Sequence, residues 1–585
     1  MNNSTIPRPP HQKMFRTGWH DSCLDYSITR LCKVCLGAKR GGSDMRGRGN
    51  LRQLLLPIIL ILMVTRGSTF GTTYYVDPSG SDSANGLSEA NAWQTLSHAN
   101  TVVTSGDTLF LRGGVYTGNN QNISPGRSAQ VSNIKYVAYP GEKPHITGYW
   151  GHDAVVNLDG DTHITVDGLV ISNNFRSVVC RSNSDYVKIY NCTLGWSSLN
   201  GTGPRTVSAG PNVRLFQTQF GHFSNTVFRE WGYVSSGGGD IGTLLETETW
   251  GETGTHQGFH LIEDCTFISG GHDLIRLYSP NCVVRNCYLS NENWMQGLGG
   301  IMNGNRLIET GGEQSKRSLI ENCTFGWTGI PPDNPDIVSG IECTTGDNII
   351  RKSTFHMMRG PSVSFYDKGG SPSPDRNYVY NCSFYRSGYD SAIRSQGRVT
   401  VWFVRAEANR IFNITSYQTG STGMYWSQGG PTLADQIFSG NFEDTGDPLF
   451  QSTTLINSET RFPPDFRLQA GSVCIDNGVW LTTITSPSGS GTTLDVTDAG
   501  FFSDGLGVPG VEGDRIQFEG SSTIHRISSI DYANNRLVLT GVASWTQGQG
   551  LALPYHGSGP DQGAHEWGIG SFVAPEAPTN LRIVQ

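Results

Sequence analysis

Six copies of one short motif constrain the fold of this chain more than any other feature. Five copies between residues 260 and 384 read HLIEDCTF, VVRNCYL, LIENCTF, IIRKSTF and YVYNCSF, and VKIYNCTL precedes them at residues 187–194. The ends of the five later copies lie 22 to 36 residues apart. A fixed motif at variable spacing predicts one conserved bend per coil, with loops of different length elsewhere.

The copies are rich in Val, Ile, Tyr and Phe and show no helical period, which is typical of short β-strands. Parallel strands stacked coil on coil would form a β-solenoid that buries the inner face of each coil on its neighbours. A polar residue recurs at the bend, where Asn suits a left-handed backbone, and we expect a ladder of Asn191, Asp264, Asn286, Asn322 and Asn381, with Ser353 in the remaining copy. A row of buried cysteines should follow it, formed by Cys192, Cys265, Cys287, Cys323 and Cys382.

This pattern resembles the right-handed parallel β-helix superfamily of carbohydrate-active proteins over roughly residues 73–478. The resemblance implies an all-β, single-stranded solenoid whose first coil is capped by a short helix around residues 93–103. IKYVAYPGEKPHITG is similar to the second-coil motif of polysaccharide-lyase-like β-helices. DPLFQ and PDFRLQAGSVCIDNG resemble the terminal coil motif, whose closing phrase returns only at GPDQGAHEWG, residues 559–568.

The delayed closing phrase predicts an insertion. We expect an upstream or leader sequence at 1–44, a signal peptide at 45–71 and the β-helix at 72–478. A small inserted β domain at 479–556, a terminal strand at 557–571 and a linker tail at 572–585 follow. The signal peptide is indicated by the apolar run LRQLLLPIILILMV, which follows basic residues and precedes small ones. That run is too short to predict a membrane span.

Charge and cysteine content narrow the function classes. Residues 1–71 carry 11 Lys and Arg against 3 Asp and Glu, which leaves 31 against 47, or about −16, for the rest of the chain. So acidic a protein is a poor nucleic-acid binder. Nine cysteines follow residue 71, and an odd number cannot pair completely within one chain. We therefore expect a secreted monomer that acts without nucleic acid, membrane or organic cofactor.

Aligning the coils on their bends predicts a column of outward side chains on the preceding strands. The column reads Arg181, Val207, Glu246, Arg276, Glu309, Glu342, Ser364 and Arg394. Successive coils stack about 4.8 Å apart, so Glu309 and Glu342 should be direct neighbours, with Arg276 one coil earlier. Two glutamates side by side need a cation between them, and Ca²⁺ held by Glu246, Glu309 and Glu342 would suit.

Loops beside the column add groups that can move protons. His272 precedes Arg276, and Tyr366 and Lys368 follow the strand after Glu342. β-Elimination from a uronic acid needs a cation for the carboxylate, a base for the C5 proton and an acid for the leaving oxygen. Arg276 or calcium on Glu309 and Glu342 would provide the first. Substrate-binding candidates are Arg181, Arg394, Trp294 and Trp327.

ETGGEQSKRSLIENCTF and GIECTTGDNIIRKSTF resemble motif strands of the calcium-dependent alginate and chondroitin lyases of this fold. The resemblance implies a role for Glu342 and, less directly, for Glu309. Those lyases carry two carboxylates on one strand and a Lys in the next turn, whereas Glu342 stands alone here. A secreted lyase on an acidic glycan is the first prediction. A glycoside hydrolase using two of the glutamates is the second, and a non-catalytic sugar-binding or adhesin solenoid is the third.

Overall fold

The computed structural model describes residues 71–568, with gaps at 127–129, 150–153, 196–210, 232–242, 248–256, 271–272, 292–305, 313–315, 329–338, 370–372, 389–398, 421–422 and 454–463. The predicted leader, nearly all of the predicted signal peptide and the predicted tail at 572–585 lie outside these residues. In the described residues, no helix is long and apolar enough to cross a bilayer.

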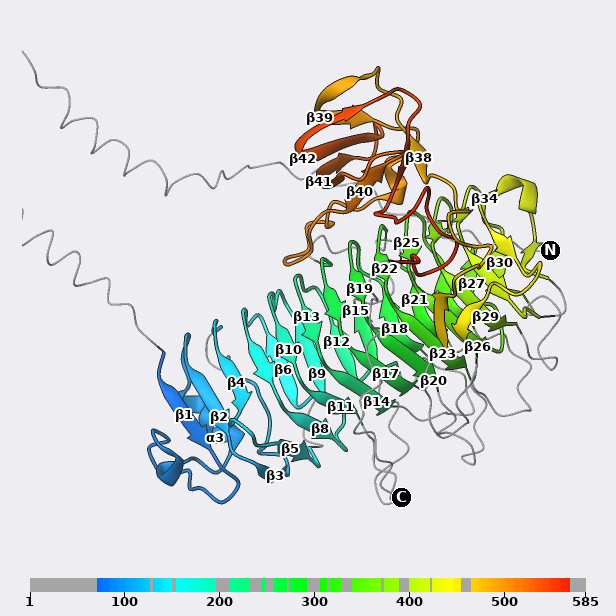
Figure 1. Ribbon diagram of the computed structural model, residues 1–585. Coiled ribbons are helices and arrows are strands. Elements are labelled where there is room, and N and C mark those ends of the chain that lie inside the picture. The colour runs from blue at the N-terminus through cyan, green and yellow to red at the C-terminus, as the bar shows by residue number, and fades with distance from the viewer. Residues whose placement is uncertain are drawn as a thin grey trace, which may run out of the picture. The chain divides into compact units, whose positions relative to one another are not determined.

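Three long parallel sheets wind around one core, so the predicted right-handed parallel β-helix is confirmed (Figure 1). From residue 156 on, each coil contributes one strand to each sheet in the order C, A, B, whereas the described strands before it belong to sheets A and B. Neighbouring strands in a sheet come from successive coils. We name the sheets A, B and C.

Sheet A contains β1 (Thr73–Val76), β2 (Thr108–Leu111), β4 (Lys135–Ala138), β7 (Thr165–Asp167), β10 (Lys188–Tyr190), β13 (His222–Ser224), β16 (Leu261–Glu263), β19 (Val283–Arg285), β22 (Leu319–Glu321), β25 (Ile349–Arg351), β28 (Tyr378–Tyr380), β31 (Arg410–Phe412) and β34 (Ile437–Ser439). Sheet B contains β3 (Gly114–Thr117), β5 (Pro144–Thr147), β8 (Val170–Ser172), β11 (Thr193–Gly195), β14 (Val227–Trp231), β17 (Thr266–Gly270), β20 (Tyr288–Asn291), β23 (Thr324–Thr328), β26 (Thr354–Met358), β29 (Ser383–Ser387), β32 (Thr415–Tyr417) and β35 (Phe442–Glu443). Sheet C contains β6 (Val156–Asp159), β9 (Val178–Arg181), β12 (Val213–Leu215), β15 (Leu245–Thr247), β18 (Asp273–Leu277), β21 (Arg306–Thr310), β24 (Ser339–Cys343), β27 (Val363–Tyr366), β30 (Val401–Val404) and β33 (Tyr425–Gln428).

The bend between sheets A and B is the predicted polar ladder. Its residues have left-handed backbones, and Asn286 donates from its amide to the Asp264 carboxylate of the previous coil at 3.1 Å. One assignment was wrong: the ladder position in the copy IIRKSTF belongs to Lys352 (φ 49°), while Ser353 is buried in the cysteine row. Lysine keeps the left-handed bend although its long side chain cannot reproduce the short amide contact.

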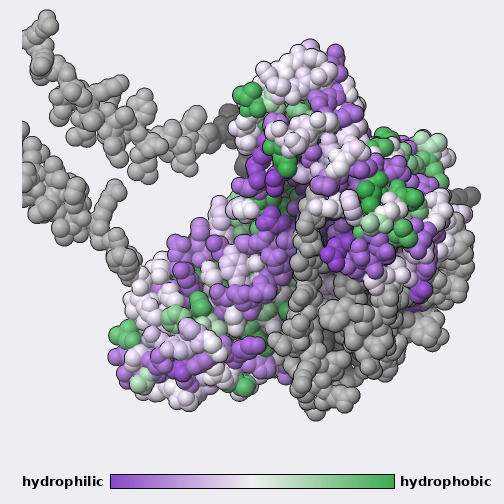
Figure 2. All heavy atoms as spheres, in the orientation of Figure 1, coloured by the Kyte–Doolittle hydropathy of each residue, from purple (hydrophilic) through white to green (hydrophobic). Residues whose placement is uncertain are grey.

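Side chains of like kind stack inside the coils, as the repeat predicts. The rings of Phe325 and Phe355 lie 4.4 Å apart, centroid to centroid, and those of Phe355 and Phe384 lie 4.9 Å apart. The five predicted row cysteines are buried and free. Hydrophilic residues cover much of the visible surface of the described part, with hydrophobic ones in smaller groups (Figure 2). The inner stacks therefore supply the core.

The first coil is covered by α3 (Leu96–Val102), which buries Leu96 and Ala99, at the place where the cap helix was expected. Thr95 caps it by accepting from the backbone N–H of His98 at 3.1 Å. Three short helical turns also occur in the described residues: η1 (Glu89–Asn91), η3 (Leu433–Asp435) and η4 (Ala499–Phe501). The strands β36 (Phe450–Ser452) and β37 (Asp465–Leu468) pair antiparallel after the last coil.

Residues 482–552 form a separate antiparallel sheet, which lies in the range where sequence predicts the insertion. It contains β38 (Thr482–Thr483), β39 (Gly489–Asp495), β40 (Arg515–Phe518), β41 (Ile524–Asp531), β42 (Arg536–Trp545) and β43 (Gly550–Ala552). Its apolar side chains form one cluster with residues of sheet A such as Leu319, Ile349 and Tyr378. The inserted sheet therefore packs against the outer face of sheet A (Figure 1).

Candidate active site

Sheet C carries a charged residue at the same register position over five consecutive coils. The register places Arg214, Glu246, Arg276, Glu309, Glu342, Ser364, Trp402 and Trp426 opposite one another in chain order. Arg276 thus pairs with Glu309, and Glu309 with Glu342, which are the neighbours that the coil alignment predicts. We call these eight positions the sheet C column.

The first member of the predicted column was wrong. Arg181 pairs with Asp159, and Val179 holds the column position of β9. Arg181 instead donates to the Asn157 side chain at 2.5 Å. A slip of two residues keeps a side chain on the same face of the sheet, so alternation alone could not detect it. Val207 and Arg394 lie outside the described residues.

Arg276 lies among three carboxylates and is almost inaccessible to solvent. Its side chain is 4% exposed, and its Nε lies 2.5 Å from Asp273 Oδ2 and 3.6 Å from Glu309 Oε2. Its Nη1 lies 3.3 Å from Glu246 Oε2. Asp273 is 0% exposed and Glu309 is 2% exposed, so this guanidinium compensates buried negative charge.

Arg306, which sequence reasoning missed, joins the two halves of the cluster. Its Nε lies 2.8 Å from Glu342 Oε1, and its Nη1 lies 3.5 Å from Glu309 Oε2. Burial alone would lower the pKa of Arg306, but the attraction of Glu342 and Glu309 outweighs burial and raises the pKa well above its usual value. Arg306 therefore stays charged at any pH at which the protein folds.

The spacing of Arg306 from Glu309 explains why it was missed. Alternation along a strand puts residues three apart on opposite faces. Here Leu307 and Ile308 are both in the core, so alternation is interrupted within the strand, and the flanking Arg306 and Glu309 side chains meet at 3.5 Å. Asp273 and Arg276 repeat this geometry around the core pair 274–275. The signal in the sequence is a pair of apolar residues between two charged ones.

Lys368 covers the cluster on its solvent side. It follows β27, and its Nζ makes a close contact with Glu309 Oε1 and lies 3.4 Å from Glu342 Oε1. The Lys368 side chain is 32% exposed, compared with 2% for Glu309 and 8% for Glu342. One ammonium therefore reaches both neighbouring carboxylates from the solvent side.

Aromatic side chains continue the column past Ser364. Trp402 is 8% exposed and lies 5.8 Å from Tyr366, centroid to centroid, whereas Trp426 is 37% exposed. At about 4.8 Å per strand, Trp426 lies about 14 Å from Glu342 along the sheet. The predicted Tyr366 thus packs beside Trp402. His272 and Trp294 lie outside the described residues, and Trp327 lies in β23, not in sheet C.

The donor set does not fit the predicted calcium site. Ca²⁺ takes six to eight oxygen ligands, whereas the oxygens of Glu246, Glu309 and Glu342 already face arginine and lysine side chains. The cluster holds four cations and four carboxylates: Arg214, Arg276, Arg306 and Lys368 against Glu246, Asp273, Glu309 and Glu342. No group of three metal-ligating side chains occurs within the described ranges. Calcium stays a prediction that chelation tests.

No known family model matches this sequence, and no curated protein matches it. Solved structures are similar in fold. A pectate lyase, Pel9A, shares 15% identity at a TM-score of 0.41, covering 73% of this chain and 96% of its own. A rhamnogalacturonan lyase shares 15% sequence identity at a TM-score of 0.36, and the match covers 66% of this chain and 91% of that lyase. A GH136 lacto-N-biosidase from Eubacterium ramulus shares 13% sequence identity at a TM-score of 0.36, and the match covers 66% of this chain and 70% of that enzyme.

The neighbours thus include polysaccharide lyases and a glycoside hydrolase on β-helix folds. The fold of this chain rests on its own three parallel sheets and not on these likenesses. The predicted resemblance to the parallel β-helix superfamily is confirmed at the level of the fold.

Proposed function

We propose that this protein is a secreted, monomeric enzyme that cleaves an acidic polysaccharide by β-elimination at the sheet C column. The observation that carries the proposal is the contact of one partly exposed lysine, Lys368, with the two adjacent carboxylates Glu309 and Glu342. Cations and carboxylates in one water-poor cluster provide both the charge stabilisation and the proton transfers that the reaction needs.

Binding of a uronate would use the cationic side of the cluster. Arg306 is 15% exposed and lies next to the carboxylates that Lys368 contacts, so it is the guanidinium placed to receive the substrate carboxylate. Neutralising that carboxylate acidifies the C5 proton. Arg276 is too buried to touch the substrate, and we assign it the positioning of Glu309 and Glu246.

Proton transfer would centre on Lys368. After passing one proton to Glu309, its neutral amine can remove the C5 proton. The electron pair of the C–H bond then forms the C4=C5 double bond as the C4–O bond breaks. The ammonium of Lys368 then donates this proton to the leaving oxygen. Glu309 finally transfers the first proton back to the amine of Lys368. No metal enters this sequence of steps.

The flank of the column supports a polymeric substrate. Trp426 presents an exposed indole about 14 Å from Glu342 in the same register, and aromatic faces pack well against the C–H faces of sugar rings. A chain bound along sheet C would contact the charged cluster and this tryptophan together.

A glycoside hydrolase is the second candidate, because Glu309 and Glu342 lie close enough to share one ammonium. A panel of uronic-acid and neutral polysaccharides distinguishes the two by product. Ultraviolet absorbance of unsaturated ends indicates elimination, and reducing ends without that absorbance indicate hydrolysis. Binding without either product would support the sugar-binding solenoid and refute the enzyme proposal.

A further inference from the structure

A polar pocket lies where sheet A, the inserted sheet and the terminal segment meet. It has a volume of about 380 Å³. Side chains of Lys352, Arg515, Glu566 and Asn322 line it, together with apolar residues of the 552–554 segment. We call it the junction pocket.

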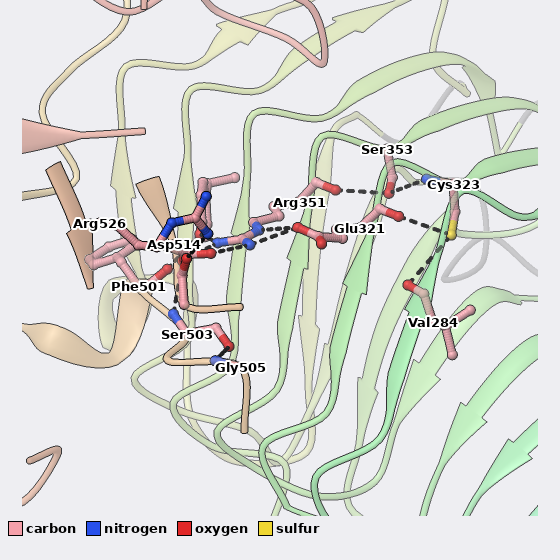
Figure 3. Close-up of polar contacts among 12 residues, drawn as sticks. Val284, Glu321, Cys323, Arg351, Ser353, Phe501, Ser503, Gly505, Asp514 and Arg526 are labelled. Atoms are coloured by element: carbon pink, nitrogen blue, oxygen red, sulfur yellow. Dashed lines mark hydrogen bonds and ion pairs between the residues drawn. The ribbon is translucent and has the colours of Figure 1, made fainter. Parts of the chain in front are cut away.

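One wall of the pocket is a saturated ion-pair network that fixes the inserted sheet in place. Arg351 donates to Asp514 through two nitrogens, at 2.6 and 2.7 Å, and to Glu321 Oε2 at 2.6 Å (Figure 3). The Arg351 side chain is 4% exposed. Arg351 and its two carboxylate partners therefore neutralise one another, and few of their hydrogen-bonding groups remain for a ligand.

Two other cations of the pocket are compensated less closely, because the carboxylates of Glu321, Glu566 and Asp514 attract Lys352 without an ion-pair contact. Neither Lys352 nor Arg515 pairs with a carboxylate anywhere in the described part of the chain. Lys352 is half-buried, and burial followed by repulsion from Arg351 lowers its pKa. A bound anion would relieve both effects. Arg467, at the same pocket, is already paired with Asp465 at 2.5 Å.

Glu566 adds a group that can donate a hydrogen bond. Its Oε1 accepts from the backbone N–H of Asp561 at 3.0 Å, while its Oε2 is buried without a hydrogen-bond partner. Burial, with repulsion from Asp561, raises the pKa of Glu566 to about 8. This raised pKa favours the protonated carboxyl group near neutral pH, although Lys352 and Glu566 still attract each other.

We propose that the junction pocket binds one acidic sugar unit, with Lys352 and Arg515 holding its carboxylate and Glu566 bonded to a hydroxyl. Cations without a carboxylate in direct contact favour an anion. The Glu566 carboxyl group and the Asn322 amide suit hydroxyls, and the apolar wall at 552–554 suits the C–H face of a sugar ring. The pocket is separate from the sheet C column, so its binding does not depend on cleavage.

The ladder itself offers a matched variant. Asn occupies the Lys352 position in other coils and adopts the same left-handed backbone, so Lys352→Asn removes the ammonium while preserving the bend. Lys188→Asn, at an exposed position of sheet A, is the control for removing one surface charge. Glu566→Gln keeps the donor of the neutral carboxyl group and should retain binding.

Calorimetric titration of the full chain with galacturonate, galactose and inorganic phosphate tests the proposal. We expect galacturonate to bind wild type and Lys188→Asn equally, Lys352→Asn to bind at least about tenfold more weakly, and galactose not to bind. Failure of wild type to bind galacturonate, or unchanged affinity in Lys352→Asn, would overturn it. Tighter binding of phosphate than of galacturonate would overturn the assignment to an acidic sugar. Because no bond is cleaved, a failure here leaves the sheet C proposal standing.

Discussion

Replacing Arg276 and Lys368 separately by Met should divide the sheet C cluster into a structural and a chemical part. Both changes remove one cation and keep an unbranched side chain. Arg276 is 4% exposed and forms ion pairs with Asp273, Glu246 and Glu309, so its replacement leaves the negative charge of these buried carboxylates without its main partner. Breaking a buried ion pair in this way costs about 3–5 kcal/mol.

Lys368 should behave differently because its side chain is 32% exposed and because Glu309 keeps Arg276 and Arg306 as neighbours. Its replacement should cost about 1 kcal/mol or less, as for solvent-accessible ion pairs. Its loss should nevertheless reduce cleavage at least about a hundredfold, as expected for a general acid or base.

The assay is urea unfolding followed by circular dichroism, alongside cleavage of the polymer that wild type degrades. Lys188→Met, an exposed change on β10, is the control for both readouts. Equal stabilities for the Arg276 and Lys368 variants would refute the account of buried compensation. Full activity in Lys368→Met would remove that residue from the chemistry.

Three further predictions follow from other parts of the molecule. Burial lowers the pKa of His260 to about 3 and of His356 to about 4. Because both values lie below the unfolded value near 6.5, the free energy of unfolding should fall by about 2 kcal/mol per histidine from pH 6.5 to 5. Replacing both by Gln should reduce this pH dependence, measured by urea unfolding at each pH. Arg351→Met and Asp514→Asn should be strongly non-additive in a double-mutant cycle, by at least about 2 kcal/mol, and additive values would refute a coupled docking pair. Trp426→Ala should raise KM several-fold with kcat nearly unchanged, and an unchanged KM would exclude it from substrate binding.

The fold was predictable because its signal repeats. Each coil must place an apolar strand inward and a left-handed residue at the A–B bend, so the motif ending at Phe325 reports the same geometry as the one ending at Phe384. The Lys352 position was misread because a single coil departs from the pattern, and lysine is not a typical residue for a left-handed bend.

The centre of the site was predictable where strands follow one another without a shift. Arg276, Glu309 and Glu342 occupy equivalent places in three successive coils, and sequence alignment of the bends is enough to bring them together. Arg306 was not predictable from alternation, because two successive core residues, Leu307 and Ile308, separate it from Glu309. The junction pocket was not predictable either, since Arg515 comes from the insertion and meets Lys352 only through docking.

The most direct test of elimination at sheet C is to let the protein cleave its uronate polymer in water labelled with ¹⁸O and to measure the masses of the products by mass spectrometry. Elimination breaks the C4–O bond without adding water, so we predict unsaturated fragments whose new reducing ends carry no label at the moment of cleavage. Digestion with Lys368→Met should give no fragments above the background. Saturated fragments carrying ¹⁸O at the new reducing end would contradict the account, because they would show that water, and not loss of the C5 proton, completes the reaction.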